Sequence, residues 1–331
     1  MTQTTKDAVL TEFLNNPGRY ISGDFIAGEL GLSRESIWKA IQQLRREGHE
    51  IVSKKKSGYC YLRTAKLNAA VIEKYLPEQD VCRTIVFDQI DSTQIYAKDY
   101  ISQHKIEEPL AVVTASQTAG YGRRGRHFYS PEGNGLYISL ILPVQESRIE
   151  AGLLTTSAAA AIVGVLESFF PDKEFQLKWV NDFLLKQHKI GGIITEAVMD
   201  LESQTYSALI LGFALNIQPS NFPEEISQKA GTILDERDES LDYNLLTAYL
   251  LDALIEMYEH YQDGRYMAFY RQHSALIGQQ VTVQIGTELV EGTVTGIDDQ
   301  GALLLKTTAG DDRTVYSGEV TKVKLMSNLN L

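Results

Sequence analysis

Three glycines and three arginines lie close together in residues 117–127, directly after a strongly apolar stretch. Gly120, Gly122 and Gly125 have the GxGxxG spacing of a dinucleotide-binding turn. Such a turn must open a helix whose amino terminus receives the pyrophosphate, but residues 130–135 contain a proline and two glycines before another predicted strand. The pattern argues against an NAD site. It favours a flexible loop whose guanidinium groups bind an anion, over a basic surface loop that binds nothing.

A second candidate for chemistry is Lys178, which ends a predicted strand and is followed closely by an Asn-Asp pair at residues 181–182. A lysine beside a ligand can neutralise a carboxylate and a phosphate as they approach each other. An ordinary solvated lysine is the alternative. Small residues at Gly192 and just before Asn216 would let a ligand lie close to the strand backbone, although they could equally mark bulges.

The first 65 residues contain the pattern of a DNA-binding module. Helical spacing predicts helices over residues 9–14, 23–30 and 33–46, and the third helix has a polar and basic face. Two extended runs then follow, joined by a lysine-rich turn. This order is typical of a winged helix-turn-helix, whose last helix enters the major groove. The predicted DNA contacts are Arg34, Glu35, Lys39, Gln42 and Arg46 on the helix and Lys54, Lys55 and Lys56 on the wing.

The charge distribution agrees with nucleic-acid contact at one end of the chain. The formal net charge of the 331 residues is −12, which argues against a protein whose whole surface binds nucleic acid. Residues 1–65 nevertheless carry ten Lys or Arg against seven Asp or Glu, a net charge of +3, so the remainder carries −15. The excess is modest, and a solvated turn on a small packing module remains the alternative to DNA binding.

The remaining residues are expected to form an α+β body and a β-rich end. Strands joined mainly by turns, with a few long helices between them, favour a mixed sheet over a doubly wound parallel one. The predicted strands of the body are 84–90, 110–116, 136–142, 175–179, 190–198 and 207–215, and its helices are 92–104, 150–170 and 241–261. The end is predicted to form a small β-barrel from strands 281–285, 290–297, 302–307 and 314–316. We expect three domains, at residues 1–65, 67–275 and 276–331.

Composition excludes several other classes. Hydrophobic residues at 44% and charged residues at 22% are values of a globular protein with a real core. The strongest apolar stretch, 153–166, is too short for a membrane span, and the start of the chain has no secretion signal, so we expect a cytoplasmic protein. No two of the six histidines have metal-ligand spacing, and we expect no protein-bound metal site.

Taken together, these motifs resemble those of the biotin protein ligases. The winged helix at the start makes the chain similar to the bifunctional form, which is both ligase and biotin operon repressor. The resemblance runs from the head to the terminal barrel. It is carried by Asp91-Ser92-Thr93, Gln117 with Gly120 to Arg126, Lys178-Trp179 with Asn181-Asp182, Lys189 with Gly192-Ile193, and Asn216.

The resemblance implies a fold and an activity. The fold is a winged helix, a mixed-sheet catalytic domain of the biotin/lipoate protein ligase type, and an SH3-like barrel. The enzyme would join biotin to ATP with Mg²⁺, giving biotinyl-5′-AMP, and then biotinylate one lysine of a biotin carboxyl carrier protein, such as that of acetyl-CoA carboxylase. The winged helix would bind operator DNA of biotin genes as a ligand-promoted homodimer. No membrane partner is expected.

The resemblance also assigns residues to these steps. Lys178 and Arg123 would be catalytic. Arg123, Arg126 and Asn216 would bind ATP or the adenylate. Biotin would be bound by Ser92, Thr93, Gln94, Gln117, Gly120, Tyr121, Gly122, Arg123, Lys178 and Gly192.

Some residues depart from the family pattern. Tyr121 lies where the family often has arginine, Val180 replaces a proline, and Phe213-Ala214 replaces smaller residues beside the predicted biotin site. An arginine that usually follows the motif at 318–322 is absent, and Lys322 or Lys324 could substitute for it. Two other functions remain open: a winged-helix regulator that senses a small acid without catalysis, and a ligase for another carboxylate such as lipoate.

Overall fold

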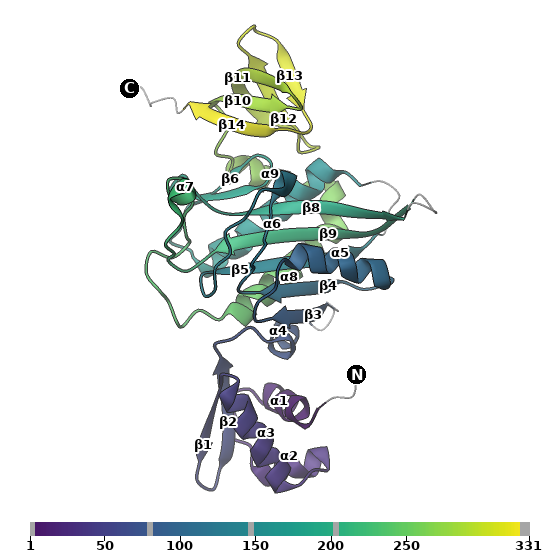
Figure 1. Ribbon diagram of the computed structural model, residues 1–331, viewed down its shortest axis with the longest axis vertical. Coiled ribbons are helices and arrows are strands. Elements are labelled where there is room, and N and C mark those ends of the chain that lie inside the picture. Colours follow the sequence, from purple (N-terminus) through teal and green to yellow (C-terminus); the bar gives the residue numbers. More distant parts are fainter. Residues whose placement is uncertain (1–3, 78–81, 145–148, 201–204, 325–331) are drawn as a thin grey trace. The chain divides into compact units, whose positions relative to one another are not determined.

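The structure, a computed structural model, describes residues 4–77, 82–144, 149–200 and 205–324 (Figure 1). The chain divides into two compact units. Residues 1–79 and 239–248 form the first, called the N-terminal unit below. Residues 80–238 and 249–331 form the second, called the larger unit.

Three helices pack together in the N-terminal unit: α1 (Thr5–Asn15), α2 (Gly23–Leu30) and α3 (Arg34–Arg46). The Ser33 side chain accepts a hydrogen bond from the backbone N–H of Ser36 and so caps the start of α3, as the sequence predicts. The core that holds the helices together is apolar and almost fully buried. It includes Val9, Phe13, Ile26, Ile37, Ile41 and Leu44.

A two-stranded hairpin follows the helices, formed by β1 (His49–Lys54) and β2 (Gly58–Thr64), and α4 (Ala69–Tyr75) comes next. The backbones of Ile21 and Tyr59 exchange two hydrogen bonds of 2.8 Å, which attach the hairpin to the segment between α1 and α2. Gly58 makes this approach possible, because its φ is +101° and a Cβ there would lie 2.0 Å from the Ile21 carbonyl oxygen.

A seven-stranded mixed sheet forms the centre of the larger unit, in the spatial order β3-β4-β5-β9-β8-β7-β6 (Figure 1). Only the β3–β4 pair is parallel among these described strands. The strands are β3 (Arg83–Phe87), β4 (Leu110–Thr114), β5 (Gly135–Pro143), β6 (Phe175–Lys178), β7 (Asp182–Leu185), β8 (His188–Asp200) and β9 (Thr205–Asn216).

Helices cover this sheet and supply the rest of its core. Helix α5 (Thr93–Gln103) packs on β4, β5 and β9 through Ala97 and Ile101. Helix α6 (Ala151–Phe169) is long and apolar enough to span a membrane, but most of it is buried within the unit, as in the core helix of a globular domain. The remaining helices are α7 (Glu224–Ser227), α8 (Tyr243–His260), the 3-10 turn η2 (Tyr261–Asp263) and α9 (Arg265–Gln272).

A five-stranded antiparallel sheet forms the last part of the larger unit, in the order β13-β12-β11-β10-β14. Two side chains of the central part donate hydrogen bonds to this sheet: Trp179 Nε1 donates to Gly301 O at 2.9 Å, and Arg271 Nε donates to Ile297 O at 2.7 Å. The strands are β10 (Gln280–Ile285), β11 (Glu288–Ile297), β12 (Leu303–Thr307), β13 (Asp312–Val315) and β14 (Glu319–Lys324).

The predicted fold class is confirmed: a helix-turn-helix, a central mixed sheet and a C-terminal antiparallel β-domain. Some elements were not predicted. The four-residue strand β7 and the short helices α4, α7 and α9 are too short for a clear apolar period. The last strands were also placed incompletely. Strand β13 begins at Asp312 rather than Thr314, because pairing with β12 sets its register, and β14 was not predicted as a strand.

Candidate functional site

A cavity of about 300 Å³ lies in the larger unit, where the start of α5, the Gly/Arg loop (residues 120–126), β8, β9 and the end of β6 meet. It collects nearly all side chains that the sequence singled out for ligand binding. Those that line it are Ser92, Thr93, Gln94, Gln117, Tyr121, Gly122, Arg123, Arg126, Lys178, Gly192 and Asn216. Gly120 is not among the lining residues.

A network of short polar side chains forms one part of the cavity wall, which we call the floor. Thr93 donates its backbone N–H to Gln117 Oε1 at 2.9 Å, and Ser92 caps α5 by accepting from the backbone N–H of Ile95. Gly120 is explained here, because a Cβ on it would lie 2.7 Å from Gln117 Nε2. It leaves room for the Gln117 amide and does not line the cavity itself.

The Gly/Arg loop is folded as a tight hairpin. Gly122 N donates to Arg126 O and Phe128 N donates to Gly120 O, both at 2.8 Å. Between them lies the single 3-10 turn η1 (Arg123–Gly125), in which Arg124 itself has a left-handed φ of 59°. The three arginines therefore project from one compact turn.

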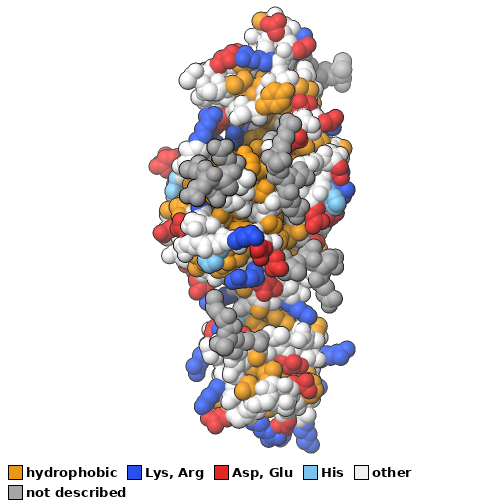
Figure 2. Space-filling model, turned by 90° about the vertical axis from the view of Figure 1, so that its right-hand side faces the viewer, with side chains coloured by type: hydrophobic (Ala, Val, Ile, Leu, Met, Phe, Trp, Pro, Cys, Tyr) orange, Lys and Arg blue, Asp and Glu red, His pale blue; other side chains and the backbone are white. Residues whose placement is uncertain are grey.

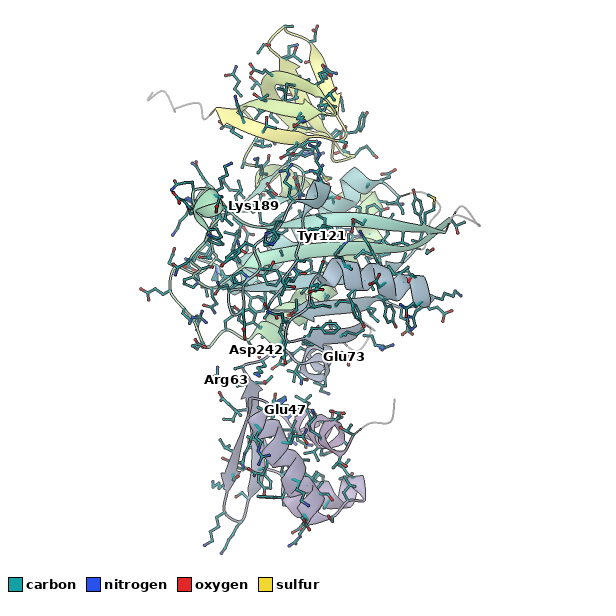
Figure 3. All side chains as sticks on the ribbon, in the orientation of Figure 1. Glu47, Arg63, Glu73, Tyr121, Lys189 and Asp242 are labelled. Carbon is teal, nitrogen blue, oxygen red and sulfur yellow. The ribbon has the colours of Figure 1, made fainter. Side chains whose placement is uncertain are left out.

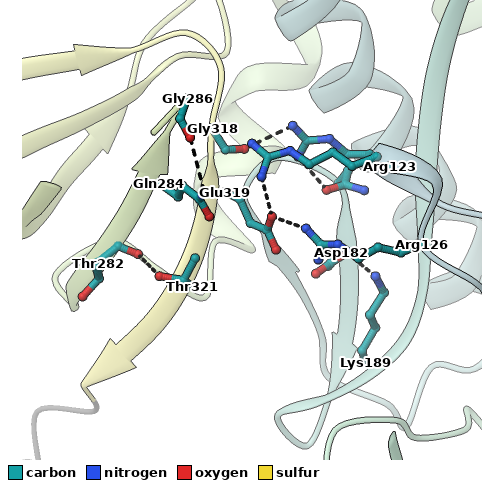
Figure 4. Close-up of polar contacts among 12 residues, drawn as sticks. Arg123, Arg126, Asp182, Lys189, Thr282, Gln284, Gly286, Gly318, Glu319 and Thr321 are labelled. Carbon is teal, nitrogen blue, oxygen red and sulfur yellow. Dashed lines mark hydrogen bonds and ion pairs between the residues drawn. The ribbon is translucent and has the colours of Figure 1, made fainter. Parts of the chain in front are cut away.

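Arg123 is the most enclosed of these arginines. It donates to Asn181 Oδ1 at 3.2 Å and to Gly318 O at 3.1 Å (Figure 4). Burial and the neighbouring Arg124 guanidinium lower the pKa of Arg123 below its ordinary value. Because that ordinary value lies far above neutral pH, the group stays cationic and is held by directional bonds. An anion in the cavity would meet a pre-oriented guanidinium.

Arg124 and Arg126 have a carboxylate partner in the terminal sheet. Both pair with Glu319 of β14, Arg124 at 3.2 Å (Figure 4). The hydrogen bond from Arg126 holds the pKa of Glu319 below its usual range, although burial opposes the shift. A phosphate that reached Arg126 would therefore have to share it with Glu319 or displace that carboxylate.

Three lysines line the cavity, Lys178, Lys189 and Lys229. Figure 3 labels Lys189 and Tyr121 among the side chains of the larger unit. Lys189 Nζ donates to Asp182 Oδ1 at 2.5 Å (Figure 4). Lys178 lies opposite Asp182 in the β6–β7 ladder, and no carboxylate of the described residues pairs with it. Arg123, Lys178 and Lys189 thus make a cationic group at one side of the cavity, offset by one aspartate.

A further part of the cavity wall combines an amide with apolar side chains and the side chain of Lys229. Asn216, at the end of β9, is buried and donates from Nδ2 to Gly231 O at 3.1 Å. Phe222, Ile226 and Ala230 line the cavity nearby. An amide next to apolar side chains suits a flat heteroaromatic ring with polar edges.

In the N-terminal unit, the exposed face of α3 bears the predicted DNA contacts, and Figure 2 shows Lys and Arg side chains over the surface of this unit. Two of the cations are paired within the unit, Arg34 with Asp24 and Lys39 with Glu35 at 2.7 Å. These pairs are highly exposed and therefore weak, so a phosphate backbone could displace the carboxylates. Gln42 is half-buried, whereas Arg46 and all three wing lysines are exposed, and Lys54 lies over the Tyr20 ring.

Comparison with known proteins gives three family matches along the chain. Residues 6–60 match the model of an HTH domain, residues 86–216 that of the biotin/lipoate A/B protein ligase family, and residues 276–323 that of the biotin protein ligase C terminal domain. The bifunctional ligase/repressor BirA of Bacillus subtilis is 30% identical over 327 residues, which cover 97% of this chain and 99% of the relative. The chain belongs to the bifunctional ligase/repressor BirA family.

Other relatives agree with this membership. The bifunctional ligase/repressor BirA of Escherichia coli is 31% identical over 294 residues, covering 87% of this chain and 89% of that protein. The biotin protein ligase from Aquifex aeolicus, solved in complex with biotin and ATP, superimposes with a TM-score of 0.59 at 25% identity, covering 72% of this chain and 97% of that one.

Sequence reasoning about this biotin protein ligase assigned no role to several residues at its site. Asn181, Asp182 and Lys189 were only part of the family pattern, and their contacts with Arg123 and with each other appear once β6, β7 and β8 are paired. Glu319 meets the loop arginines from 193 residues away in the chain, so no local pattern could reveal it. Trp38 was also missed, although it is 53% exposed on α3 beside the predicted DNA contacts.

Proposed function

We propose that the larger unit joins biotin to ATP to form biotinyl-5′-AMP and pyrophosphate, and then transfers the biotinyl group to a lysine of a biotin carboxyl carrier protein. The observation that carries the proposal is the cavity itself, in which a polar floor lies next to the cationic group of Arg123, Lys178 and Lys189. Relatives in Mycobacterium tuberculosis and Paracoccus denitrificans are biotin–[acetyl-CoA-carboxylase] ligases, so acetyl-CoA carboxylase is the expected source of the carrier domain.

The floor is suited to the head group of biotin, a cyclic urea with one carbonyl and two N–H groups. Ser92, Thr93 and Gln117 provide short donors and acceptors that the start of α5 and their mutual hydrogen bonds hold in place. Gln94, Tyr121, Gly122 and Gly192 line the same cavity and complete the proposed biotin contacts. Gly120 contributes only by making room for Gln117.

The cations serve the reaction. An oxygen of the biotin carboxylate attacks the α-phosphorus of ATP in line with departing pyrophosphate, and negative charge accumulates on the phosphoryl oxygens. Arg123 would orient the carboxylate, and Lys178 and Lys189 would neutralise the charge that develops. The Lys189–Asp182 contact of 2.5 Å fixes where one of these ammonium groups lies.

ATP would extend toward Asn216 and its apolar neighbours, with Arg126 near the phosphates. The described residues hold no cluster of three or more His, Cys, Asp or Glu side chains that could bind a metal ion on its own. Asp182 and Glu319 are the carboxylates of the described residues that line the cavity. They fit Mg²⁺ arriving on the phosphates, because Mg²⁺ is commonly held by one or two carboxylates and the substrate phosphates. Bound Mg²⁺ would lower the repulsion between carboxylate and triphosphate.

In the second half-reaction the ε-amine of the carrier lysine attacks the acyl carbon, and AMP leaves. The Gly/Arg loop would keep water from the mixed anhydride until the carrier arrives. No covalent enzyme intermediate is needed.

We assign DNA binding to the helix-turn-helix, with operator DNA of biotin genes as the target and the adenylate as the signal that promotes a homodimer. Two recognition helices related by a two-fold axis suit a palindromic site. We also propose that the chain has three domains, at residues 1–65, 67–275 and 276–331, and that the protein is cytoplasmic.

Transfer to a carrier domain tests the ligase. The full chain with biotin, ATP and Mg²⁺ should add one biotinyl group to the carrier, and a carrier whose acceptor lysine is replaced by arginine should stay unmodified, as read by intact-protein mass. Lipoate in place of biotin is the matched substrate control. Transfer of lipoate with no transfer of biotin would overturn the choice of substrate.

Sedimentation and gel-shift experiments test whether the adenylate promotes dimerisation and DNA binding. With biotin and ATP the mass of the full chain should move from monomer toward dimer, and binding to the region upstream of the biotin genes should tighten. If biotin and ATP change neither the mass nor the DNA affinity, ligand-promoted dimerisation is wrong, and the proposed ligase activity is unaffected.

A further inference from the structure

Tyr121 is the one residue of the Gly/Arg loop that is neither glycine nor arginine, and its hydroxyl lies between two charged side chains. Lys98 Nζ donates to the Tyr121 hydroxyl oxygen at 2.9 Å, and the hydroxyl donates to Glu196 Oε2 at 3.2 Å. Lys98 Nζ also lies 5.4 Å from the centroid of the Tyr121 ring, within range of a cation–π contact. The loop is therefore tied to charged groups that it does not itself contain.

Glu196 is the centre of these contacts. Its Oε1 accepts from Lys98 Nζ at 2.8 Å, and its Oε2 accepts from Gln94 Nε2 at 2.6 Å as well as from Tyr121. Lys98 and Gln94 belong to α5 and Glu196 to β8, so one carboxylate connects the loop, the helix and the sheet. Lys98 and Glu196, the two partners of Tyr121, are half-buried, and Gln94 is buried. Partial burial makes these hydrogen bonds stronger than fully exposed ones.

The network continues from Glu196 to the floor of the cavity. Ser139 Oγ donates to Gln94 Oε1 at 2.8 Å and lies 2.9 Å from Thr93 Oγ1. Gly212 on β9 makes room for this arrangement, because a Cβ there would lie 2.2 Å from Gln94 Oε1. The loop position and the proposed biotin floor are thus joined by one continuous set of side-chain contacts.

Lys98 provides the positive charge that neutralises Glu196 in this network. An arginine at position 121 could pair with the Glu196 carboxylate directly. Here the loop offers a neutral phenol, and the ammonium group that neutralises Glu196 comes from α5. Burial lowers the pKa of Lys98, but the hydrogen bonds and electrostatic attraction of Glu196 and Tyr121 together outweigh that effect and raise the pKa, so Lys98 is charged at neutral pH.

We propose that Lys98 and Glu196 are positioning residues that hold the Gly/Arg loop over the cavity through Tyr121, and that Lys98 supplies the positive charge which the loop lacks at position 121. The consequence for the reaction rests on the proposed ligase function. A loop held in this way retains the adenylate and excludes water, whereas a released loop lets it escape.

Removing either the Tyr121 hydroxyl or the Lys98 ammonium group should release the loop in the protein without ligand. Trypsin cleaves after arginine, so cleavage within residues 123–126 measures how often the loop opens. Tyr121→Phe removes only the hydroxyl, and Lys98→Met removes the charge while keeping the length of the side chain. Each should raise the cleavage rate and the rate of adenylate release about threefold to tenfold, the loss expected for one hydrogen bond. For Lys98→Met, whose side chain does not line the cavity, the rate of adenylation at saturating biotin and ATP should change much less.

Lys105→Met is the matched control, because Lys105 follows the same helix and forms an exposed ion pair with Glu107. It should leave both rates at their parent values. Thermal melts of each variant separate loop release from loss of the fold. If Lys98→Met destabilises the whole chain, Tyr121→Phe still decides, because it deletes one oxygen without changing the ring.

The sharpest test exchanges the source of the charge. Tyr121→Arg should impair adenylate retention in the parent, where it places a second cation next to Lys98, and should restore retention in the Lys98→Met background. If Lys98 had only a structural role, Tyr121→Arg would not impair adenylate retention in one background and restore it in the other. The proposal is overturned if Tyr121→Arg acts equally in both backgrounds, or if Lys98→Met releases the loop no more than Lys105→Met. If the parent forms no adenylate with biotin, the proposed function fails, and the trypsin rates still decide the role of Lys98.

Discussion

The two functional surfaces of this protein use positive charge in opposite ways. On the N-terminal unit, Arg34 and Lys39 have side chains that are 77% and 67% exposed, and each pairs only with a neighbouring exposed carboxylate. In the cavity, Arg123 is enclosed and bound to Asn181 and to a backbone carbonyl of the terminal sheet. The first arrangement attracts a polyanion without fixing its atoms, and the second fixes the direction of each hydrogen bond before a ligand arrives.

The difference in the exposure of these cations determines what each surface can recognise. Exposed, loosely paired cations give affinity that depends on salt and on the number of phosphates contacted. Enclosed cations act on one or two atoms of a small ligand, and their effect is largest on charge that develops during a reaction. Substitutions and salt should therefore affect the two surfaces differently, and the following experiments measure that difference.

The largest effect is expected from the lysines of the cavity. Lys178→Ala and Lys189→Ala should each lower the rate of adenylation by about 10²–10³, because each removes charge stabilisation that acts in the transition state. Biotin binding, measured by calorimetry, should change little. Lys186→Ala is the control, because Lys186 pairs with the exposed Asp235 outside the cavity lining. Equal losses in binding and rate would reassign the lysine to recognition of the substrate.

A smaller effect is expected for Arg123, which holds the ligand more than it drives the chemistry. Arg123→Ala removes a charged donor and should accelerate release of the adenylate by about 10-fold to 100-fold. Stopped-flow release of the preformed adenylate measures it. If the adenylate leaves the variant no faster than the parent, the assigned role is wrong.

On the N-terminal unit the expected change is in salt dependence. Replacing Lys54, Lys55 and Lys56 together by alanine should make the log–log dependence of DNA affinity on salt less steep by about 2–3 per protomer, since each phosphate contact contributes about 0.9. Adenylation by the same variant should keep its parent rate. An unchanged slope would show that the wing does not contact phosphates.

The smallest effect concerns pH and the core of the N-terminal unit. His49 is buried against Tyr61, with 3.2 Å between Nδ1 and the hydroxyl oxygen, and burial lowers the pKa of His49. The unfolded chain therefore binds a proton more readily than the folded unit does, so stability is lost as the pH falls below the unfolded value of about 6.5. Trp38 fluorescence should report a lower melting temperature at pH 5 than at pH 7.5.

His49→Asn, which cannot titrate in this range and keeps a hydrogen-bonding group near the Nδ1 position, should flatten that dependence. An identical pH dependence in the variant would show that other groups cause it.

The sequence was sufficient to predict the parts of this molecule that depend on local patterns. Apolar spacing and a serine cap predicted α3, and the glycines and arginines of residues 120–126 marked the loop at the cavity. The proline and glycines of residues 130–135 argued against a dinucleotide turn, because no helix can start there. The contacts that complete the site could not be predicted, because they join distant segments. Glu196 meets Tyr121 across 75 residues, and Glu319 meets Arg126 across 193. The reason for a glycine at position 120 is visible only in the folded chain, because folding brings the Gln117 side chain to the place where a Cβ would lie.

The most direct test of the proposed adenylation reaction is exchange of labelled pyrophosphate into ATP by the full chain with Mg²⁺, with and without biotin. Because the cavity is proposed to join the biotin carboxylate to the α-phosphorus reversibly, label should enter ATP only when biotin is present. The exchange should proceed without DNA and should be nearly lost in Lys178→Ala and Lys189→Ala. Exchange that does not require biotin, or biotin binding with no exchange at all, would contradict the assignment of this cavity as the site of adenylation.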